Sequence, residues 1–332
     1  MEFTQRFVTT NGIRMRVTEC GQGQPVIFCH GFPHTWYIWH RQLSAVAAAG
    51  YRAIAPDLRG YGQTDAPADP AAYTNRAVCA DLLGLLDDIG AEQAVFVGLD
   101  FGAVLVWELA LRAPRRVRGL IVLNNPFVPR PRRAPSQLWA KAAARHFLHL
   151  HYFQTPGVAD TELGARPKDF LARVYYALSA DYHYLDTWRF PAEGTGYLDV
   201  LPEAPALPWS WLSEDELDVI ARDFERTGFT GGLNWYRALD LNWEITADYA
   251  DAKVAVPTYF LYGDHDPDME GFSGHDPLAV MRENVVDLRA VTEIADAGHL
   301  VQWERTEEVN ALLTAHLRDL TTYPSWPSEV LS

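Results

Sequence analysis

Short apolar runs bounded by turn residues recur along the first part of the chain and predict buried β-strands. Between them lie longer segments whose apolar residues repeat at helical spacing, and two of these segments end at Gly50 and Gly90. Alternating strands and helices are typical of a parallel sheet with helices on both faces. The predicted strands span residues 25–30, 52–56, 94–98 and 120–124, and the predicted helices span 38–49, 76–89 and 102–112.

The pattern changes after Pro126. Residues 126–136 hold four prolines and three arginines, and prolines interrupt regular structure. Residues 137–240 then show helical patterns rich in aromatic residues, without a strand-like run. This stretch predicts a helical insertion.

Strand-like runs return at residues 257–263 and 290–294, and a helical pattern follows over about 304–320. Residues 13–19 alternate more roughly and predict an antiparallel edge strand, while two prolines predict an irregular tail over 321–332. We therefore expect a discontinuous α/β core, a mostly parallel sheet flanked by helices, which a helical cap interrupts. The expected boundaries are 1–128 for the first part of the core, 129–240 for the cap and 241–332 for the second part.

The composition fits a well-buried globular core, with 48% hydrophobic and 21% charged residues among 332. The net charge of −15 argues against nucleic-acid or acidic-membrane binding, which need a basic surface. The N-terminus lacks the apolar stretch of a signal peptide, and no apolar run reaches transmembrane length. Three widely spaced cysteines, Cys20, Cys29 and Cys79, suggest neither a disulfide framework nor a zinc site. We expect a cytoplasmic protein.

The run VGLDFG, residues 97–102, has the form of a nucleophile elbow, a tight strand-to-helix turn that exposes one reactive side chain. The elbow usually carries serine, but here it carries Asp100. A carboxylate attacks esters poorly, yet it can displace a leaving group from saturated carbon and form an alkyl-enzyme ester. Asp100 therefore points to epoxide opening or halide removal. Without partners, a helix N-cap would be the better interpretation of this aspartate.

The chain offers the partners that hydrolysis of such an ester requires. His299 lies in a loop between the last predicted strand and helix, where it can activate water as a base. A carboxylate must orient that base. Asp266 follows the preceding strand and is our choice for this acid, with Asp264 and Asp268 as close rivals.

Backbone amides must stabilise the charge that develops on the ester carbonyl. One is the N–H of Phe101, the residue after the nucleophile, and the other is the N–H of Phe32 in the loop HGFP. The order nucleophile, acid, histidine is that of the α/β-hydrolases.

At these residues the chain resembles the epoxide hydrolases of the α/β-hydrolase superfamily, in particular the soluble type. The resemblance covers nearly the whole length. It rests on HGFPHTWYIW (30–39), APDLRGYGQTDAP (55–67), the elbow (98–102), LNNPF (123–127), YFQTPGVA (152–159) and GGLNWYR (231–237).

The resemblance implies a small-molecule epoxide substrate, a covalent intermediate on Asp100, and neither cofactor nor metal. It also implies that Tyr152 and Tyr236 in the cap bind the epoxide oxygen, which two phenols can do by donating hydrogen bonds. Residues expected to bind the substrate are Pro33, Trp36, Leu99 and Trp235. A homodimer through the cap is compatible with this picture.

The chain departs from the family on both sides of the nucleophile, where Leu99 and Phe101 replace the usual histidine and tryptophan. These changes affect the shape of the pocket and the choice of substrate. The histidines at positions 146, 149 and 151 suggest a partly exposed helix face rather than a metal site, because no carboxylate or cysteine is spaced to join them.

Two alternative functions remain open. A haloacid or fluoroacetate-type dehalogenase shares the aspartate nucleophile, but it would need arginines where this chain has Phe101 and Val104. A non-catalytic small-molecule-binding relative would have lost turnover while keeping the pocket. The complete set of nucleophile, base and acid argues against that second alternative.

Overall fold

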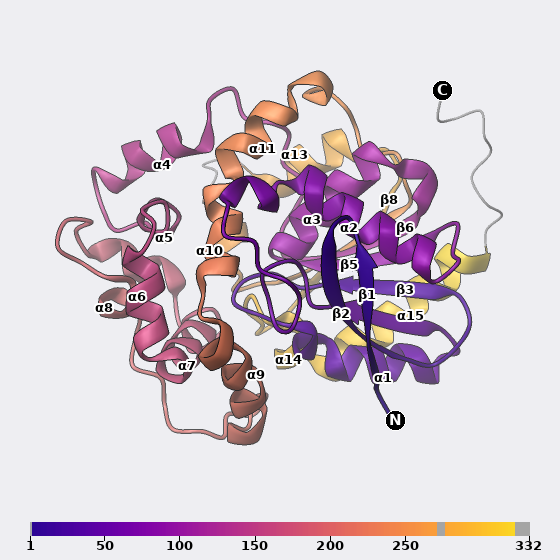
Figure 1. The fold of residues 1–332 in the computed structure, drawn as a ribbon, viewed down its shortest axis with the longest axis horizontal. Helices are drawn as coiled ribbons and strands as arrows, with labels where there is room; N and C mark the ends of the chain where they lie inside the picture. Colours follow the sequence, from indigo (N-terminus) through magenta and orange to yellow (C-terminus); the bar gives the residue numbers. More distant parts are fainter. Residues whose placement is uncertain (1, 271–275, 323–332) are drawn as a thin grey trace.

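The computed structural model describes residues 2–270 and 276–322, and its strands form one sheet. In sheet order, the strands are β1 (Thr4–Thr10), β2 (Ile13–Cys20), β4 (Arg52–Pro56), β3 (Pro25–Cys29), β5 (Ala94–Leu99), β6 (Val117–Leu123), β7 (Thr258–Gly263) and β8 (Leu288–Ile294). Strands β1 and β2 are antiparallel to their neighbours, and the pairs from β4 to β8 are parallel. The sheet is twisted and mostly parallel (Figure 1).

The predicted strands are present with their ends shifted by at most three residues. The structure also has one strand that the sequence analysis did not predict, β1. Its polar residues Thr4, Gln5 and Arg6 are exposed or half-buried because the strand lies at the sheet edge. The predicted edge strand, β2, is therefore the second strand, and all but one of its residues are buried or half-buried.

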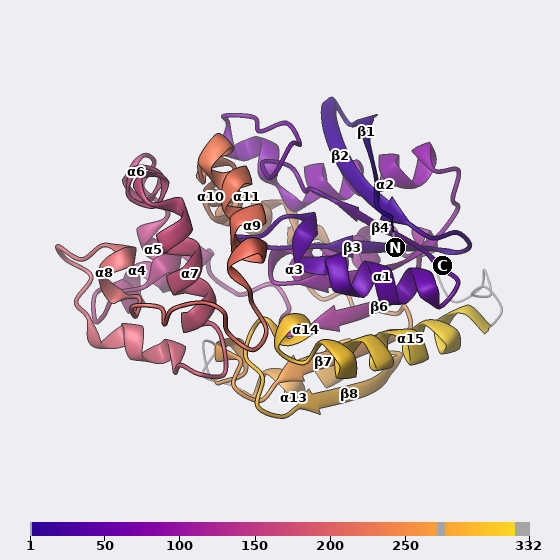
Figure 2. The ribbon, with the colours of Figure 1, turned by 90° about the horizontal axis from the view of Figure 1, so that it is seen from below.

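Helices cover both faces of the sheet. Helices α1 (His40–Ala48) and α15 (Thr306–Thr322) pack together on one face, and α2 (Asn75–Asp88) and α3 (Phe101–Arg112) pack together on the other (Figure 2). The helix predicted over about 304–320 corresponds to α15, and the short helix α14 (Val301–Glu304), which was not predicted, precedes it. The irregular tail predicted over 321–332 lies outside the described residues from 323 onward.

The stretch between β6 and β7, which is described throughout, has helices and no strand. These helices lie at one end of the sheet and form a cap over it (Figures 1 and 2). They are α4 (Pro135–Ala143), α5 (His149–Tyr152), α6 (Val158–Ala165), α7 (Pro167–Ala177), α8 (Tyr197–Val200), α9 (Glu214–Thr227), α10 (Thr230–Arg237) and α11 (Leu239–Ile245). The expected cap boundary at residue 240 falls inside α11.

Within the described ranges, no helix combines the length and the apolar character that crossing a membrane would require.

The turn between β5 and α3 depends on close contact between backbones. A Cβ atom on Gly102 would lie 2.0 Å from the carbonyl oxygen of Cys29, the last residue of β3. A Cβ on Gly98 would lie 2.5 Å from the carbonyl oxygen of Gly102. Glycine at both positions therefore lets α3 begin directly against the sheet. This close approach holds Asp100 at the sheet edge.

We predict that Gly102→Ala lowers the free energy of unfolding by about 1–3 kcal/mol, because the added methyl group overlaps backbone that cannot move aside easily. Gly164→Ala is the matched control, since its Cβ meets no atom within 4 Å in helix α6. That change should stabilise by about 0.5–1 kcal/mol through helix propensity. Equal unfolding midpoints for the two variants in denaturant would contradict the packing argument.

Candidate active site

Asp100 stands at the carboxyl end of β5 in a strained backbone conformation, with φ 56° and ψ −127°. Its Oδ1 accepts a hydrogen bond of 2.7 Å from the N–H of Phe32, and the N–H of Phe101 also donates to its carboxylate. Its own N–H donates to Oδ1 of Asn125 over 2.8 Å. The side chain of Asp100 is 21% exposed, so the carboxylate is fixed yet accessible to a small molecule.

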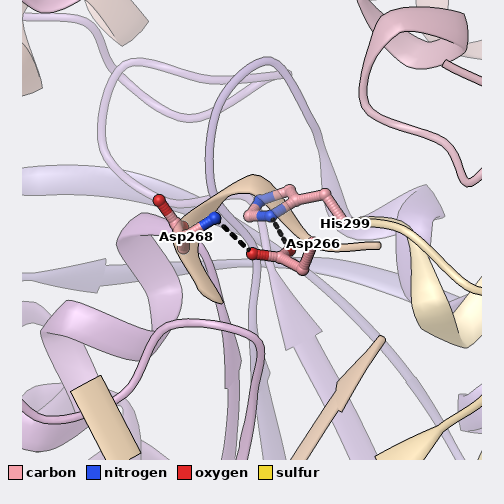
Figure 3. A group of neighbouring side chains, drawn as sticks. All are labelled: Asp266, Asp268 and His299. Atoms are coloured by element: carbon pink, nitrogen blue, oxygen red, sulfur yellow. Dashed lines mark hydrogen bonds and ion pairs between the residues drawn. The ribbon is translucent and has the colours of Figure 1, made fainter. Parts of the chain in front are cut away.

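His299 lies between two carboxylates. Its Nδ1 is 2.6 Å from Oδ2 of Asp266, which is fully buried (Figure 3). Its Nε2 lies 3.8 Å from Oδ2 of Asp100. One ring nitrogen is thus oriented by a carboxylate while the other faces the elbow, which is the geometry that a base acting at Asp100 needs.

The loop that carries His299 is tied both to the sheet and to the cap. The Nδ2 amide of Asn124 donates to the carbonyl oxygen of His299 over 2.5 Å, and the N–H of His299 donates to the carbonyl oxygen of Leu178 over 2.8 Å. A Cβ on Gly298 would lie 2.3 Å from that same Leu178 oxygen. The glycine before the histidine therefore allows the end of cap helix α7 to approach the loop.

The charges of this group stabilise one another. Burial by itself would raise the pKa of Asp100, but the hydrogen bond and charge of His299 and the amides of Phe101 and Phe32 bring it below its ordinary value. Burial would lower the pKa of His299, but the charge of Asp266 and the contacts with both carboxylates raise it well above its ordinary value. Both shifts therefore favour the ion pair of an Asp100 carboxylate with a protonated His299.

The two rival aspartates lie beside this group in different roles. Oδ1 of Asp264 accepts from the N–H of Ala297. The N–H of Asp268 donates to Oδ1 of Asp266 over 2.7 Å, and its side chain bonds the Nδ2 amide of Asn125. Burial, and next the charge of Asp266, raise the pKa of Asp268 to about 7. Of the three, Asp266 is the aspartate whose carboxylate meets Nδ1 of His299.

Donor atoms of Asp266, Asp268 and His299 lie within 4.8 Å of one another (Figure 3), a spacing that a metal ion could use. However, the Oδ2 of Asp266 and the Nδ1 of His299 face each other at hydrogen-bond distance, and the other Asp266 oxygen accepts a backbone amide. These contacts satisfy the atoms without a cation. The donor set therefore fits an orienting acid and base better than a metal site.

Tyr236, in cap helix α10, lies over the elbow. Its ring packs edge-on against two other rings, with its centroid 4.6 Å from that of Phe101 and 5.4 Å from that of Phe32. The backbone amides of these two residues donate to the carboxylate of Asp100. Burial, and next the charge of Asp100, raise the pKa of its phenol well above the ordinary value. Tyr236 is therefore a neutral phenol close to the nucleophile, as expected for a group that donates to a developing alkoxide.

Tyr152, the other cap tyrosine expected at the site, has a carboxylate partner within the cap. Its hydroxyl donates to Oε2 of Glu162 over 2.8 Å, and Glu162 also accepts the N–H groups of Tyr197 and Leu198. Glu162 thus draws the phenol into a junction between α5, α6 and α8. The binding of the reacting oxygen by Tyr152 stays a prediction, and in this structure its hydroxyl is bonded to a carboxylate of the cap.

The residues expected to bind substrate occupy varied positions. Leu99 is fully buried, so it contacts only protein. Trp235 is also buried, and its ring packs against Phe101 at 5.5 Å. The carbonyl oxygen of Pro33 accepts from a cap tyrosine. The ring of Trp36 packs against the rings of Phe3 and Tyr37.

Sequence reasoning missed the structural importance of Asn124 and Asn125. They follow β6, the parallel neighbour of β5, so their side chains reach the same sheet edge as Asp100. The side-chain oxygen of Asn125 accepts the N–H of Asp100, and the side-chain amide of Asn124 donates to the carbonyl oxygen of His299. The repeated asparagine at a strand end was the available signal, but it entered the sequence analysis only as part of the motif LNNPF.

An apolar cavity of about 570 Å³ lies beside this site, between α3, α4, α11 and the segment 125–131. Asn125 and Asp268 line it and connect it to the catalytic group, whereas Asp100 and Tyr236 are outside its lining. Its wall includes the rings of Trp107, Trp139 and Trp243. A space of this character suits an apolar group better than a charged one.

Comparison with known proteins agrees with this geometry. Residues 24–306 match the model of the alpha/beta hydrolase fold family. Epoxide hydrolase A of Mycobacterium tuberculosis is 43% identical over 325 residues, which cover 96% of this chain and 98% of that protein. Epoxide hydrolase 1 of Siraitia grosvenorii is 38% identical, over 92% of this chain and 95% of that protein.

Solved structures give the same result. Epoxide hydrolase A from Mycobacterium thermoresistibile superposes with a TM-score of 0.89 at 42% identity, over 96% of this chain and 98% of that one. An epoxide hydrolase from an endophytic Streptomyces superposes with a TM-score of 0.91 at 36% identity, over 96% of each chain. The chain therefore belongs to the α/β-hydrolase fold family and, within it, to the epoxide hydrolases.

Proposed function

We propose that this protein converts an epoxide into a vicinal diol through an ester between the substrate and Asp100. The observation that carries the proposal is a carboxylate, rather than a hydroxyl, at the elbow, within 3.8 Å of the histidine base. The names of the relatives agree with this chemistry. The contact between Asp266 and His299 supports the second half of the cycle.

In the first step, a carboxylate oxygen of Asp100 attacks a ring carbon while the carbon–oxygen bond of the epoxide breaks. The electron pair of that bond goes to the ring oxygen, which becomes an alkoxide. The phenol of Tyr236 donates a hydrogen bond to this oxygen and then its proton. The low pKa of Asp100 keeps the nucleophile ionised at neutral pH.

In the second step, water attacks the ester carbonyl. Forming the ester removes the negative charge of Asp100, so the pKa of His299 falls and the imidazolium releases its proton, which restores Tyr236 through solvent. The neutral imidazole then accepts a proton from water. The amides of Phe32 and Phe101, which bond the carboxylate at rest, stabilise the tetrahedral oxyanion. The intermediate then collapses as its bond to the substrate oxygen breaks, and that oxygen takes up the proton of the carboxylic acid that forms. The diol leaves, and Asp100 is again a carboxylate beside the imidazolium.

The dehalogenase alternative has weaker support. Phe101 packs against Trp235 and Tyr236, and Val104 is apolar, so neither can hold a substrate carboxylate. Asn125 supplies an oxygen to the N–H of Asp100 and cannot act as the triad anion. A phenol also suits a developing alkoxide better than a departing halide.

The proposal is tested by incubating the purified protein with styrene oxide and following the diol. The wild type should form diol, and Asp100→Asn should not, because an amide does not attack the ring carbon. Asp264→Asn is a matched control, since its side-chain oxygen can still accept from Ala297. Absence of diol from a panel of aliphatic and aromatic epoxides would contradict the proposal.

We predict that His299→Gln forms the ester but hydrolyses it about 10²–10⁴-fold more slowly, the usual contribution of a general base. Intact-protein mass spectrometry should show the mass of enzyme plus substrate within minutes of mixing. Rapid multiple turnover by this variant would remove His299 from the role of base.

The electrostatics give a prediction about pH. Because the negative charge of Asp100 favours the imidazolium, Asp100→Asn should lower the pKa of His299. Titration of the ring followed by NMR in both proteins measures the difference directly. The base form should then appear at a lower pH in the variant, and an unchanged titration would show that the two groups are not coupled.

A further inference from the structure

Asp268 is a third carboxyl group beside the catalytic pair, and the two steps of the reaction give it no task. It lies in the short helix α12 (Pro267–Glu270), two residues after Asp266, where it is half-buried and lines the apolar cavity. Burial, and next the charge of Asp266, oppose its ionisation and raise its pKa to about 7. A carboxyl group in such surroundings is costly unless hydrogen bonds compensate, so its partners indicate what it contributes.

The backbone of Asp268 is attached to the catalytic acid. Its N–H donates to Oδ1 of Asp266 over 2.7 Å, and the other oxygen of Asp266 lies 2.6 Å from Nδ1 of His299. Figure 3 shows this N–H directed at Asp266, while the side chain of Asp268 extends away from the acid and the histidine. The side chain is thus held at a fixed place next to the pair without replacing Asp266 in it.

The side chain of Asp268 bonds the Nδ2 amide of Asn125. The main chain of Asn125 is fixed independently, because its N–H donates to the carbonyl oxygen of Leu123 and its carbonyl oxygen accepts the indole N–H of Trp107. What remains to be fixed is the rotation of the amide group. A carboxyl group has an accepting oxygen in either protonation state. Asp268 therefore holds the NH₂ group on its own side and leaves Oδ1 of Asn125 facing Asp100.

That oxygen is the partner of the nucleophile's backbone. Oδ1 of Asn125 accepts the N–H of Asp100 over 2.8 Å. Asp100 has a positive φ of 56°, which is unfavourable for a residue with a Cβ atom and persists only where the surroundings hold it. An amide turned the other way would place its NH₂ group against this N–H, so that two donors face each other. The orientation of the Asn125 amide therefore affects the direction in which the carboxylate of Asp100 points.

These contacts form a closed ring. It runs from Asp100 to His299, Asp266, Asp268 and Asn125 and returns to Asp100. We propose that Asp268 is a positioning residue that orients the amide of Asn125 and thereby holds Asp100 in the conformation that attacks the ring carbon. This inference rests on the proposed function. In this role Asp268 forms no bond to the substrate and exchanges no proton with it.

The test measures the rate of ester formation from styrene oxide by rapid mixing, which isolates the ring-opening step. Asp268→Ala should slow this step by about tenfold, the scale of one net hydrogen bond. Asp268→Asn keeps an oxygen that accepts from Asn125, so its rate should stay within about twofold of the wild type. Equal rates for Asp268→Ala and the wild type would overturn the proposal. So would equally slow Asn and Ala variants, because the charge and not the accepting oxygen would then matter.

Glu270→Ala is the matched control, because it removes an acid from the same short helix. Its carboxylate meets the exposed ring of His183, and an exposed pair of this kind contributes little. The ring-opening rate of this variant should equal that of the wild type. A tenfold loss here as well would show that any loss of charge from α12 slows the step, which would overturn the specific role of Asp268.

The claim that Asp268 acts through Asn125 is tested by combining variants. Asn125→Ala should slow ring opening at least as much as Asp268→Ala does. The double variant should be no slower than Asn125→Ala alone, since the two residues serve one contact. Losses that multiply would show that Asp268 affects the step by another route, and the assignment would be overturned.

The side-chain amide of Asn125 gives a readout in nitrogen NMR that does not depend on activity. It needs only the conservative variant, so it holds even if Asp268→Ala does not fold. Asp268→Asn should shift the Asn125 signals, because their acceptor changes, and should shift those of Asn124, which donates to His299, much less. Unmoved Asn125 signals would overturn the contact itself.

The two levels of the account fail in different ways. If the wild type forms no ester with any epoxide, the proposed function itself fails. If the ester forms and Asp268→Ala forms it equally fast, only the present inference fails.

Discussion

The attraction between the carboxylate of Asp100 and the ring of His299 is the interaction on which the site depends. It spans two parts of the chain that are almost two hundred residues apart, one in the elbow and the other in the loop before α14. Burial opposes the charge on each group, yet each makes the other's charge favourable. Loss of the Asp100 charge on ester formation would then convert the histidine from a resting cation into a base, so one electrostatic contact links the two chemical steps.

The fold makes this contact available through the sheet edge. Glycines at 98 and 102 allow α3 to begin against β3, and the positive φ of Asp100 turns its side chain out of the sheet. Asn124 and Asn125 extend the same edge from β6 and hold both partners by their backbones. The hydrogen bond from the N–H of His299 to the carbonyl oxygen of Leu178 joins this edge to the cap, so a movement of the cap would displace His299.

The parts of the molecule that follow local rules were predictable from sequence. Buried parallel strands are short continuous apolar runs, and those at 52–56 and 94–98 were located almost to the residue. The edge strand β1 was missed because it is mostly polar, with Val8 as its buried hydrophobic residue and Phe7 exposed. Candidates for the elbow, the base and the oxyanion amides could be predicted because each has a defined place relative to a strand end.

The cap was less predictable because its side chains are positioned by packing between short helices. The resemblance implied that Tyr152 of α5 meets the substrate, and the structure adds a hydrogen bond from its hydroxyl to Glu162 that the sequence did not reveal. The histidines at positions 146, 149 and 151 suggested a partly exposed face, and in the structure His146 and His149 are half-buried while His151 is exposed. Which of several neighbouring side chains faces the site depends on contacts from α6, α8 and α10, and none of these contacts is local in sequence.

The most direct test of the account is a single turnover in heavy-oxygen water, with enzyme in excess over epoxide. If water attacks the carbonyl of an Asp100 ester, the label enters the Asp100 carboxylate, and the diol of the first turnover is unlabelled. Mass analysis of the peptide that contains Asp100, alongside the diol, distinguishes the two routes. Label in the first diol, with an unlabelled Asp100 peptide, would mean that water opens the ring directly, which contradicts the account.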